Sequence, residues 1–199
     1  TDLVLLTTQG RIKRLPVSEL ASLTARGLTL IKLKDNDKLG YASLTSGGEE
    51  AILATSGGRL LRFRITDRQL PVMGRTAQGL QALRLRSQEK LVGCLTVDPK
   101  DHLLLVSQLG YAKRLPVSAL RQGILGEIGT QMLQFTSKAD ALAGMVAATE
   151  SSEVALVTTQ RVGRVTVNSG KVWGKDGSGD RIIQLNPEEK ILNLVMANG

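Results

Sequence analysis

The sequence contains very few of the residues on which enzymes and disulfide-stabilised proteins depend. Its 199 residues include one cysteine, Cys94, and one histidine, His102. A single cysteine excludes a disulfide within the chain and fits a reducing compartment. A single histidine leaves one place for a Ser-His-Asp set, and no cluster of residues has metal-ligand spacing. No phosphate loop ending in Gly-Lys-Ser or Gly-Lys-Thr occurs. We therefore expect no catalytic residue, no metal site and no cofactor.

Aromatic residues and long apolar runs are also scarce. Aromatics make up 3% of the chain, too few for the stacking platforms that bind single-stranded nucleic acids. No apolar run reaches the roughly 18–20 residues that a membrane helix needs, and no basic amphipathic helix indicates binding to a membrane surface. The chain opens at Thr1 without a methionine or a signal-peptide pattern, so we interpret it as part of a longer protein.

Positive charge is plentiful. Lysine and arginine number 26 against 18 aspartate and glutamate, a net charge of +8 with an isoelectric point near 9.9. Such an excess favours an anionic partner, nucleic acid first and an anionic membrane second. The 42% hydrophobic content is enough for a packed core.

The chain is built from four similar units. The phrase GRIKRLPVSEL at 10–20 returns almost unchanged as GYAKRLPVSAL at 110–120. Related phrases follow throughout, and they divide the chain into units of about 1–50, 51–100, 101–150 and 151–199 within one repeat domain. One arginine recurs at the same position of each unit: Arg14, Arg62, Arg114 and Arg164.

Each unit contains four short apolar runs rich in Val, Ile, Leu and Thr, separated by turn residues. Runs of this length bounded by glycine predict strands, and TTQGR, TSGGR and SQLGY predict hairpin turns. A helix remains an alternative for PVSELASLTARG at 16–27, although its counterpart in the second unit carries Pro71. We predict an all-β, four-bladed, β-propeller-like domain with about four strands per blade, as a closed ring or an open arc.

The recurring arginine lies between two apolar positions of a predicted strand, so its side chain points to the opposite face. If that face is solvated, four arginines form a row, and neighbouring cations widen it into a basic belt suited to a polyanion. Each arginine could instead be solvating, or form a salt bridge between blades. The predicted belt consists of Arg11, Lys13, Arg14, Lys32, Lys34, Arg59, Arg62, Arg84, Arg86, Lys113, Arg114 and Arg164.

Three phrases resemble the C-terminal β-pinwheel domain of the A subunit of DNA gyrase and its topoisomerase IV counterpart. They are GYAKRLPVSAL, GRTAQGLQALRL and LTSGGEEAILATSGGRLLRFRI. The resemblance implies propeller-like blades that exchange hairpins, with no catalytic residue of their own. It also implies a basic outer rim that binds and bends double-stranded DNA, largely independently of sequence, and presents it for strand passage by a bacterial type II topoisomerase.

The resemblance further implies partners and a location. The rest of the A subunit is one partner, the B subunit is another, and the location is the bacterial cytoplasm, at the nucleoid, without a membrane. Gyrase-type members carry the basic box Gln-Arg-Arg-Gly-Gly-Lys-Gly, which is absent here. In the corresponding loops Arg26, Arg75 and Lys175 match its cations, and the resemblance adds them to the predicted DNA contacts. The sequence leaves gyrase and topoisomerase IV types open. The main rival is a propeller that binds proteins, and an enzyme with a site at the propeller axis is a second.

Overall fold

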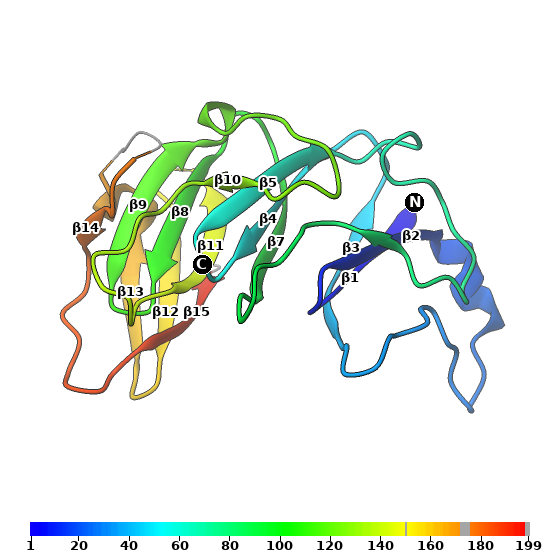
Figure 1. The fold of residues 1–199 in the computed structure, drawn as a ribbon, viewed down its shortest axis with the longest axis horizontal. Coiled ribbons are helices and arrows are strands. Elements are labelled where there is room, and N and C mark those ends of the chain that lie inside the picture. Colours follow the sequence, from blue (N-terminus) through cyan, green and yellow to red (C-terminus); the bar gives the residue numbers. More distant parts are fainter. Residues whose placement is uncertain (150, 172–175, 198–199) are drawn as a thin grey trace.

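The protein is described by a computed structural model that covers residues 1–149, 151–171 and 176–197. Within these residues fifteen strands form four sheets, in which every strand pair is antiparallel. The sheets follow the four sequence units and form a curved stack (Figure 1). The all-β, propeller-like repeat architecture expected from the sequence is therefore confirmed.

Each sheet is named A to D in chain order. Sheet A has the order β3(Leu39–Thr45), β1(Asp2–Thr7), β2(Arg11–Pro16), β6(Leu80–Gln81). Sheet B has the order β10(Thr130–Gln131), β5(Arg59–Arg64), β4(Glu50–Thr55), β7(Leu91–Val97). Sheet C has the order β11(Leu142–Ala148), β8(His102–Ser107), β9(Tyr111–Pro116), β14(Asp180–Arg181). Sheet D has three strands, β13(Val162–Thr166), β12(Glu153–Thr158) and β15(Ile191–Met196).

One strand of each of the first three sheets comes from the following unit. β6 of the second unit pairs with β2, β10 of the third pairs with β5, and β14 of the fourth pairs with β9. We call β6, β10 and β14 the exchanged strands. The register is the same at each junction: Ile12 faces Leu80, Leu60 faces Thr130 and Ala112 faces Asp180.

A glycine with positive φ precedes every exchanged strand: Gly79, Gly129 and Gly179. A Cβ atom at Gly129 would lie 2.8 Å from the carbonyl oxygen of Leu60. The backbone of the exchanged strand therefore approaches its acceptor too closely for any side chain at this position.

Replacing Gly129 with Ala should lower the free energy of unfolding by at least about 2 kcal/mol, because left-handed strain adds to a clash with main-chain atoms. Gly27 is a matched control, since its φ of +83° is similar and no atom lies within 4 Å of the added Cβ. Gly27→Ala should lower the free energy of unfolding only by the left-handed strain, about 1–2 kcal/mol. Urea denaturation of both variants measures the difference, and equal losses would contradict the close approach.

The hydrophobic core is divided into three clusters, each between consecutive sheets. One cluster joins sheets A and B, a second joins B and C, and a third joins C and D. Sheets B and C are therefore covered on both faces, which explains why their central strands read as nearly continuous apolar runs.

The stack is an open arc. Within the described residues, no strand pairing joins sheet D to sheet A, and Figure 1 places the two at opposite ends of the molecule. Sheet D consequently departs from the expected four strands, because no exchanged strand pairs with the outer edge of β13.

The predicted turns are confirmed, and the helical alternative is realised only as a short element. Gly10, Gly58 and Gly110 adopt positive φ in the hairpin turns. In the described part of the chain three short 3-10 helices follow the second strand of the first, third and fourth units: η1(Val17–Ser22), η2(Val117–Ala119) and η3(Val167–Ser169). None of the described helices is long and apolar enough to cross a membrane.

Candidate nucleic-acid interface

Three of the four recurring arginines, Arg14, Arg62 and Arg114, connect neighbouring units instead of facing solvent as a row. Arg14 is buried, and its guanidinium donates to Asp2 at 2.6 Å and to Asp67 of the second unit at 2.8 Å. Arg62 donates to Glu50 at 2.6 Å and to the carbonyl oxygen of Leu120, in the third unit, at 2.9 Å.

Arg114 continues the pattern, because its Nε donates to the carbonyl oxygen of Gly170 in the fourth unit at 3.0 Å. The prediction of an exposed row is therefore wrong for Arg14, Arg62 and Arg114. The physical reason is that the next unit covers the face to which these side chains point. The alternative of a salt bridge between blades is confirmed at Arg14, whose partner Asp67 belongs to the next unit.

Lys13 and Lys113 are also buried, which contradicts their expected place in an exposed belt. The ammonium of Lys13 donates to the carbonyl oxygens of Leu30 at 2.6 Å, Arg75 at 2.7 Å and Ala77 at 3.2 Å. Lys113 donates to the carbonyl oxygen of Met132, the residue that aligns with Leu30. Burial lowers the pKa of both lysines. Each lysine stabilises the segment near an exchanged strand.

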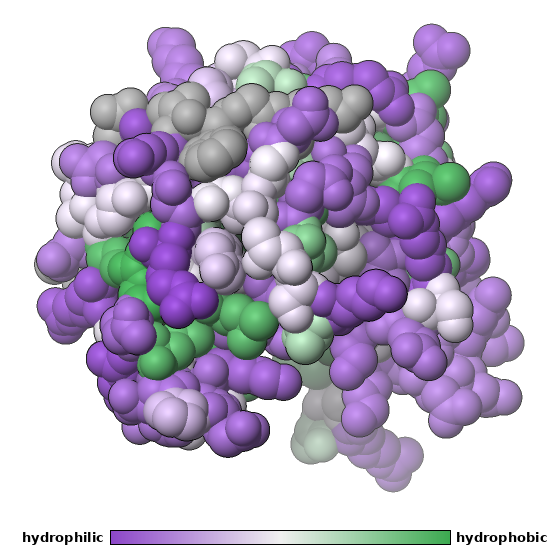
Figure 2. Space-filling model, turned by 60° about the vertical axis from the view of Figure 1, so that its left-hand side comes forward, coloured by the Kyte–Doolittle hydropathy of each residue, from purple (hydrophilic) through white to green (hydrophobic). Residues whose placement is uncertain are grey.

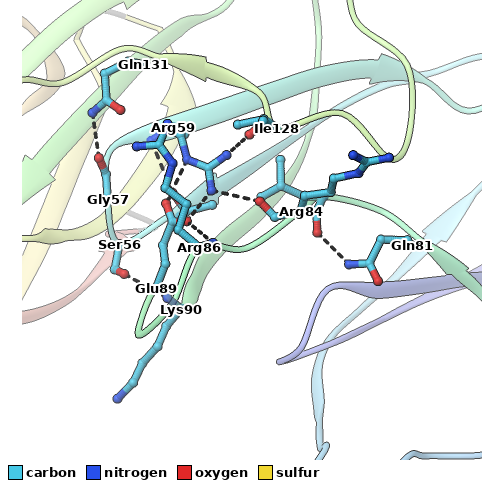
Figure 3. Close-up of polar contacts among 12 residues, drawn as sticks. Ser56, Gly57, Arg59, Gln81, Arg84, Arg86, Glu89, Lys90, Ile128 and Gln131 are labelled. Atoms are coloured by element: carbon cyan, nitrogen blue, oxygen red, sulfur yellow. Dashed lines mark hydrogen bonds and ion pairs between the residues drawn. The ribbon is translucent and has the colours of Figure 1, made fainter.

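Arg59 is the most enclosed of the predicted arginines, with a side chain 2% exposed. Its guanidinium pairs with Glu89 and also donates to the carbonyl oxygens of Arg84 and Ile128 (Figure 3). Arg161 repeats the arrangement with Glu189 at 3.0 Å, and Arg11 donates to the carbonyl oxygen of Gly79 at 2.5 Å. Arg59 is thus a structural residue, buried where the sequence predicted exposure.

An acid recurs at the position of Glu89 in each unit: Asp37, Glu89, Asp140 and Glu189. Each carboxylate accepts hydrogen bonds from the adjoining hairpin turn, for example from Gln9 N–H at 3.0 Å, Leu109 N–H at 3.1 Å and the Thr158 hydroxyl at 2.7 Å. Burial raises the pKa of Glu89, but hydrogen bonds from Arg59 and Thr55 outweigh burial and hold this pKa below its usual value. The N–H of Asn186 and the Thr158 hydroxyl lower the pKa of Glu189.

Carboxylates whose pKa is lowered, which include Glu49 as well as Glu89 and Glu189, make the stability of the fold sensitive to acid. Hydrogen bonds from the Thr45 hydroxyl and the Ser46 N–H lower the pKa of Glu49 from 4.5 to about 2. A carboxyl with a lowered pKa stabilises the fold above its unfolded value and loses that contribution as the pH falls through its folded value.

The free energy of unfolding should therefore decrease as the pH falls from about 4.5 towards about 2. Urea denaturation at several pH values measures this decrease. In Glu49→Gln the decrease should be smaller, because one of the titrating groups is gone. An unchanged pH dependence in that variant would contradict the assigned hydrogen bonds.

Of the exposed cations in the described residues, eight lie in equivalent segments at one edge of the stack. We define the basic edge as the exposed Lys and Arg of four equivalent segments, 32–38, 84–90, 134–141 and 184–190, which follow the exchanged-strand positions. In Figure 1 the turns that lead into β3, β7 and β15 lie on the lower side of the arc. The cations of the basic edge are Lys32, Lys34, Lys38, Arg84, Arg86, Lys90, Lys138 and Lys190.

Within the described part of the chain, no ion pair or hydrogen bond holds these side chains. Figure 3 shows the Lys90 side chain extending away from the cluster around Arg59 and Glu89. The same segments include two exposed acids, Asp35 and Glu188. The basic edge therefore has a surplus of unpaired cations.

The other predicted contacts lie elsewhere. Arg26 and Arg164 are exposed, whereas Arg75 pairs with Glu19 at 3.2 Å. Lys175 lies outside the described residues. Sequence reasoning missed Lys38, Lys90 and Lys190, although each stands at the same position, directly before the last strand of its unit. Further exposed cations outside the basic edge are Arg64, Arg68, Lys100, Arg121, Arg161, Lys171 and Arg181.

Exposed Lys and Arg far outnumber exposed Asp and Glu over the described residues. The face in Figure 2 is accordingly dominated by hydrophilic side chains, with small apolar patches between them. No group of three His, Cys, Asp or Glu in the described residues could hold a metal ion. The described surface is predominantly positive.

Four antiparallel sheets that exchange strands along a curved stack define a β-propeller-like repeat protein. The chain belongs to the family of DNA gyrase C-terminal domains, described as β-propellers, whose model matches residues 1–45, 49–98 and 101–147. The fourth unit lies beyond these matched ranges, and it is the unit whose phrases depart most from the others.

Relatives with similar sequences include A subunits of two bacterial topoisomerases. The chain is 42% identical to the A subunit of DNA topoisomerase 4 from Synechocystis, over 98% of this chain and 23% of that protein. It is 29% identical to the A subunit of DNA gyrase from Mycolicibacterium smegmatis, over 92% of this chain and 22% of that protein. The chain thus spans about a quarter of the length of the curated relatives it matches.

Solved structures agree with this fold. A DNA gyrase A C-terminal domain superposes with a TM-score of 0.84 at 26% identity, covering 97% of this chain and 64% of that one. The C-terminal domain of a DNA topoisomerase IV superposes with a TM-score of 0.89 at 18% identity, covering 98% and 61%. The latter likeness concerns the fold alone.

Proposed function

We propose that this domain binds double-stranded DNA through phosphate contacts and bends it along the curved stack, without catalytic groups of its own. The observation that carries the proposal is the basic edge, where unpaired cations recur at equivalent positions of successive units. Lys34 and Lys38 of the first unit correspond to Arg86 and Lys90 of the second. The third unit adds Lys138 and the fourth adds Lys190, and cations that recur along one edge of the fold suit a stiff polyanion.

The binding should depend little on base sequence. Lysine and arginine side chains on turns reach phosphates, whereas base-edge readout requires an element that enters a groove. A preference for easily bent DNA is expected, because the path of the duplex follows a curved protein surface. The scarcity of aromatic residues in the chain argues for duplex over single-stranded DNA.

We further propose that the domain serves within the A subunit of a bacterial type II topoisomerase, where it acts with the remainder of that protein and with the B subunit. The family and the relatives support this assignment. In that setting the domain would present bound DNA to the strand-passage core, in the cytoplasm at the nucleoid. The missing basic box leaves the gyrase and topoisomerase IV types equally open.

Titration of the chain into labelled random-sequence duplex, followed by fluorescence anisotropy, tests the proposal. We expect saturable binding whose affinity decreases steeply as salt rises, and similar affinities for unrelated sequences. The absence of binding at about 50 mM salt would overturn the proposal and favour the rival, a propeller that binds proteins.

A further inference from the structure

A groove with a volume of about 750 Å³ opens between the second and third units. It is lined by the loop after β5, by the exchanged strand β6 and by the loop that follows η2. Its volume lies within the range of about 300–1,000 Å³ that is typical of ligand sites. All of its lining residues belong to the second and third units, so neither end of the chain contributes to it.

The loop after β5 differs from its counterparts in the neighbouring units. The stretch from the recurring arginine to the next recurring leucine covers 62–70 in the second unit, against 14–20 in the first and 114–120 in the third. The second unit is thus two residues longer here, and in the described part of the chain it forms no 3-10 helix at this place. The longer loop contributes Arg68 and Gln69 to the groove.

Apolar side chains form part of the groove surface. Leu125 packs against the core cluster between sheets A and B, which fixes its position. Leu80 and Ile124 are 37% and 62% exposed. Exposed apolar side chains that gather in one place, with polar residues around them, are typical of surfaces that bind other proteins.

The charged side chains that line the groove are two exposed arginines, Arg64 and Arg68, and among the described residues no Asp or Glu lines it. The Nε of Arg64 donates to the carbonyl oxygen of Gly48 at 2.9 Å. Within the described part of the chain neither guanidinium forms an ion pair. Asp67 is next to Arg68 in sequence, but it pairs with a recurring arginine. The groove therefore has two cations available for carboxylates.

Two glutamines of the groove have polar atoms available as well. The side-chain oxygen of Gln69 accepts a hydrogen bond from the N–H of Leu125 at 3.2 Å, and the side-chain nitrogen of Gln81 donates to the carbonyl oxygen of Leu83 at 2.7 Å. Over the described residues, the amide nitrogen of Gln69 and the side-chain oxygen of Gln81 have no partner. One donor and one acceptor suit the main chain of a peptide, which offers both kinds of group at each residue.

We propose that this groove binds an extended acidic peptide segment of a separate protein. An apolar side chain of the segment packs against Leu80 and Ile124, and carboxylates on either side of it pair with Arg64 and Arg68. Arginine suits this role because its planar guanidinium donates two parallel hydrogen bonds to a carboxylate. Charge complementarity favours an acidic segment over a neutral or basic one.

Duplex DNA fits the groove less well, because phosphates would pair with the arginines and leave the apolar side chains uncovered. The segments of the basic edge do not line the groove, so the peptide and DNA occupy different surfaces. The proposal therefore goes beyond DNA binding and does not depend on it.

NMR titration of the nitrogen-15-labelled chain with short synthetic peptides tests the proposal. The probe is a peptide in which leucine is flanked on both sides by glutamates. We expect saturable shifts of the amide signals of Gln69, Leu80 and Ile124, with a dissociation constant below about 1 mM. A peptide with glutamine in place of each glutamate should bind at least about tenfold more weakly. Absence of binding, equal binding of the two peptides, or shifts confined to the basic edge would overturn the proposal.

Point variants locate the contact. Arg68→Glu should weaken binding of the acidic peptide by at least about tenfold, and Ile124→Ser by at least about fivefold. Both side chains are exposed, so the dispersion of the NMR signals should be unchanged. The matched controls are Lys138→Glu, the same charge change at the basic edge, and Val72→Ser, an exposed apolar residue outside the groove. They should change the affinity by less than about twofold at about 0.15 M salt, where distant charges are screened. Equal losses in variants and controls would contradict binding in the groove.

Two further measurements distinguish other occupants. Random-sequence duplex should not displace the peptide, and displacement would make the groove part of the DNA-binding surface and overturn the proposal. The peptide should also bind an intact A subunit that carries this domain as tightly as it binds the chain. Loss of binding there would mean that another part of the same polypeptide occupies the groove, which also overturns the proposal. DNA binding is measured separately by anisotropy, so failure of the peptide to bind leaves that result unaffected.

Discussion

Arg59→Met should lower the free energy of unfolding by about 3–5 kcal/mol, because it leaves the Glu89 carboxylate unpaired in the interior. Arg59 also donates to main-chain carbonyls of Arg84 and Ile128, so its loss removes bonds that hold the exchanged strand β10 against β5. In a domain of this size such a change should lower the melting temperature by roughly 6–20 °C. Urea denaturation and differential scanning calorimetry measure both quantities.

Two further variants distinguish the effect of breaking the buried Arg59–Glu89 pair from the effect of removing a positive charge. Arg84→Met removes an exposed cation from the same unit and should change stability by less than about 0.5 kcal/mol. Arg59→Met combined with Glu89→Gln should be less destabilised than the sum of the two single variants, because neither partner is left as a buried ion. A loss below about 1 kcal/mol in Arg59→Met would show that the pair is no more than a surface contact.

Neutralising four cations of the basic edge should weaken DNA binding by about 10²–10³-fold at about 0.1 M salt, since each phosphate contact contributes nearly one unit of log K per tenfold change in salt. The variant carries Lys34→Gln, Lys38→Gln, Arg86→Gln and Lys90→Gln. These side chains have no protein partner within the described residues, so the fold should be unaffected. Fluorescence anisotropy with random-sequence duplex measures the affinity.

The matched control removes the same charge from other surfaces: Arg68→Gln, Lys100→Gln, Arg121→Gln and Lys171→Gln. This control lowers the net charge by the same amount, so any difference in DNA affinity between the two variants is due to the position of the charges. We expect the control to weaken binding by less than about tenfold. Equal losses would mean that net charge alone attracts DNA and that the basic edge is not the contact surface.

The strands and turns could be predicted from the sequence because their signals are local. Short β-branched runs and glycines such as Gly10, Gly58 and Gly110 fix strands and hairpins within a few residues. The repeat then extended these assignments over the whole chain. The resemblance, not the residue pattern, implied the exchange of hairpins, because pairing between units depends on contacts far apart in sequence.

The orientation of the recurring arginines could not be read from strand alternation alone. Alternation states that Arg14 points away from Leu15, but it does not state whether the next unit covers that face. One signal was available: an acid precedes the arginine by 12 residues in two units, Asp2 before Arg14 and Glu50 before Arg62. Recurring opposite charges across a hairpin indicate structural pairs.

The exposed cations carry a weaker sequence signal than the buried ones. Lys38, Lys90 and Lys190 recur before the last strand of their units, but single lysines on turns are common on any soluble protein. These lysines form a common surface only because the curved stack brings equivalent turns to one edge.

The most direct test of where the protein contacts phosphates is the salt dependence of DNA binding. It is compared between the wild-type chain and the four-site variant of the basic edge. In a plot of log affinity against log salt concentration, the variant should give a shallower slope, by up to about 0.9 for each phosphate contact removed. Parallel lines for the two proteins would show that these side chains touch no phosphate, and would contradict DNA binding at the basic edge.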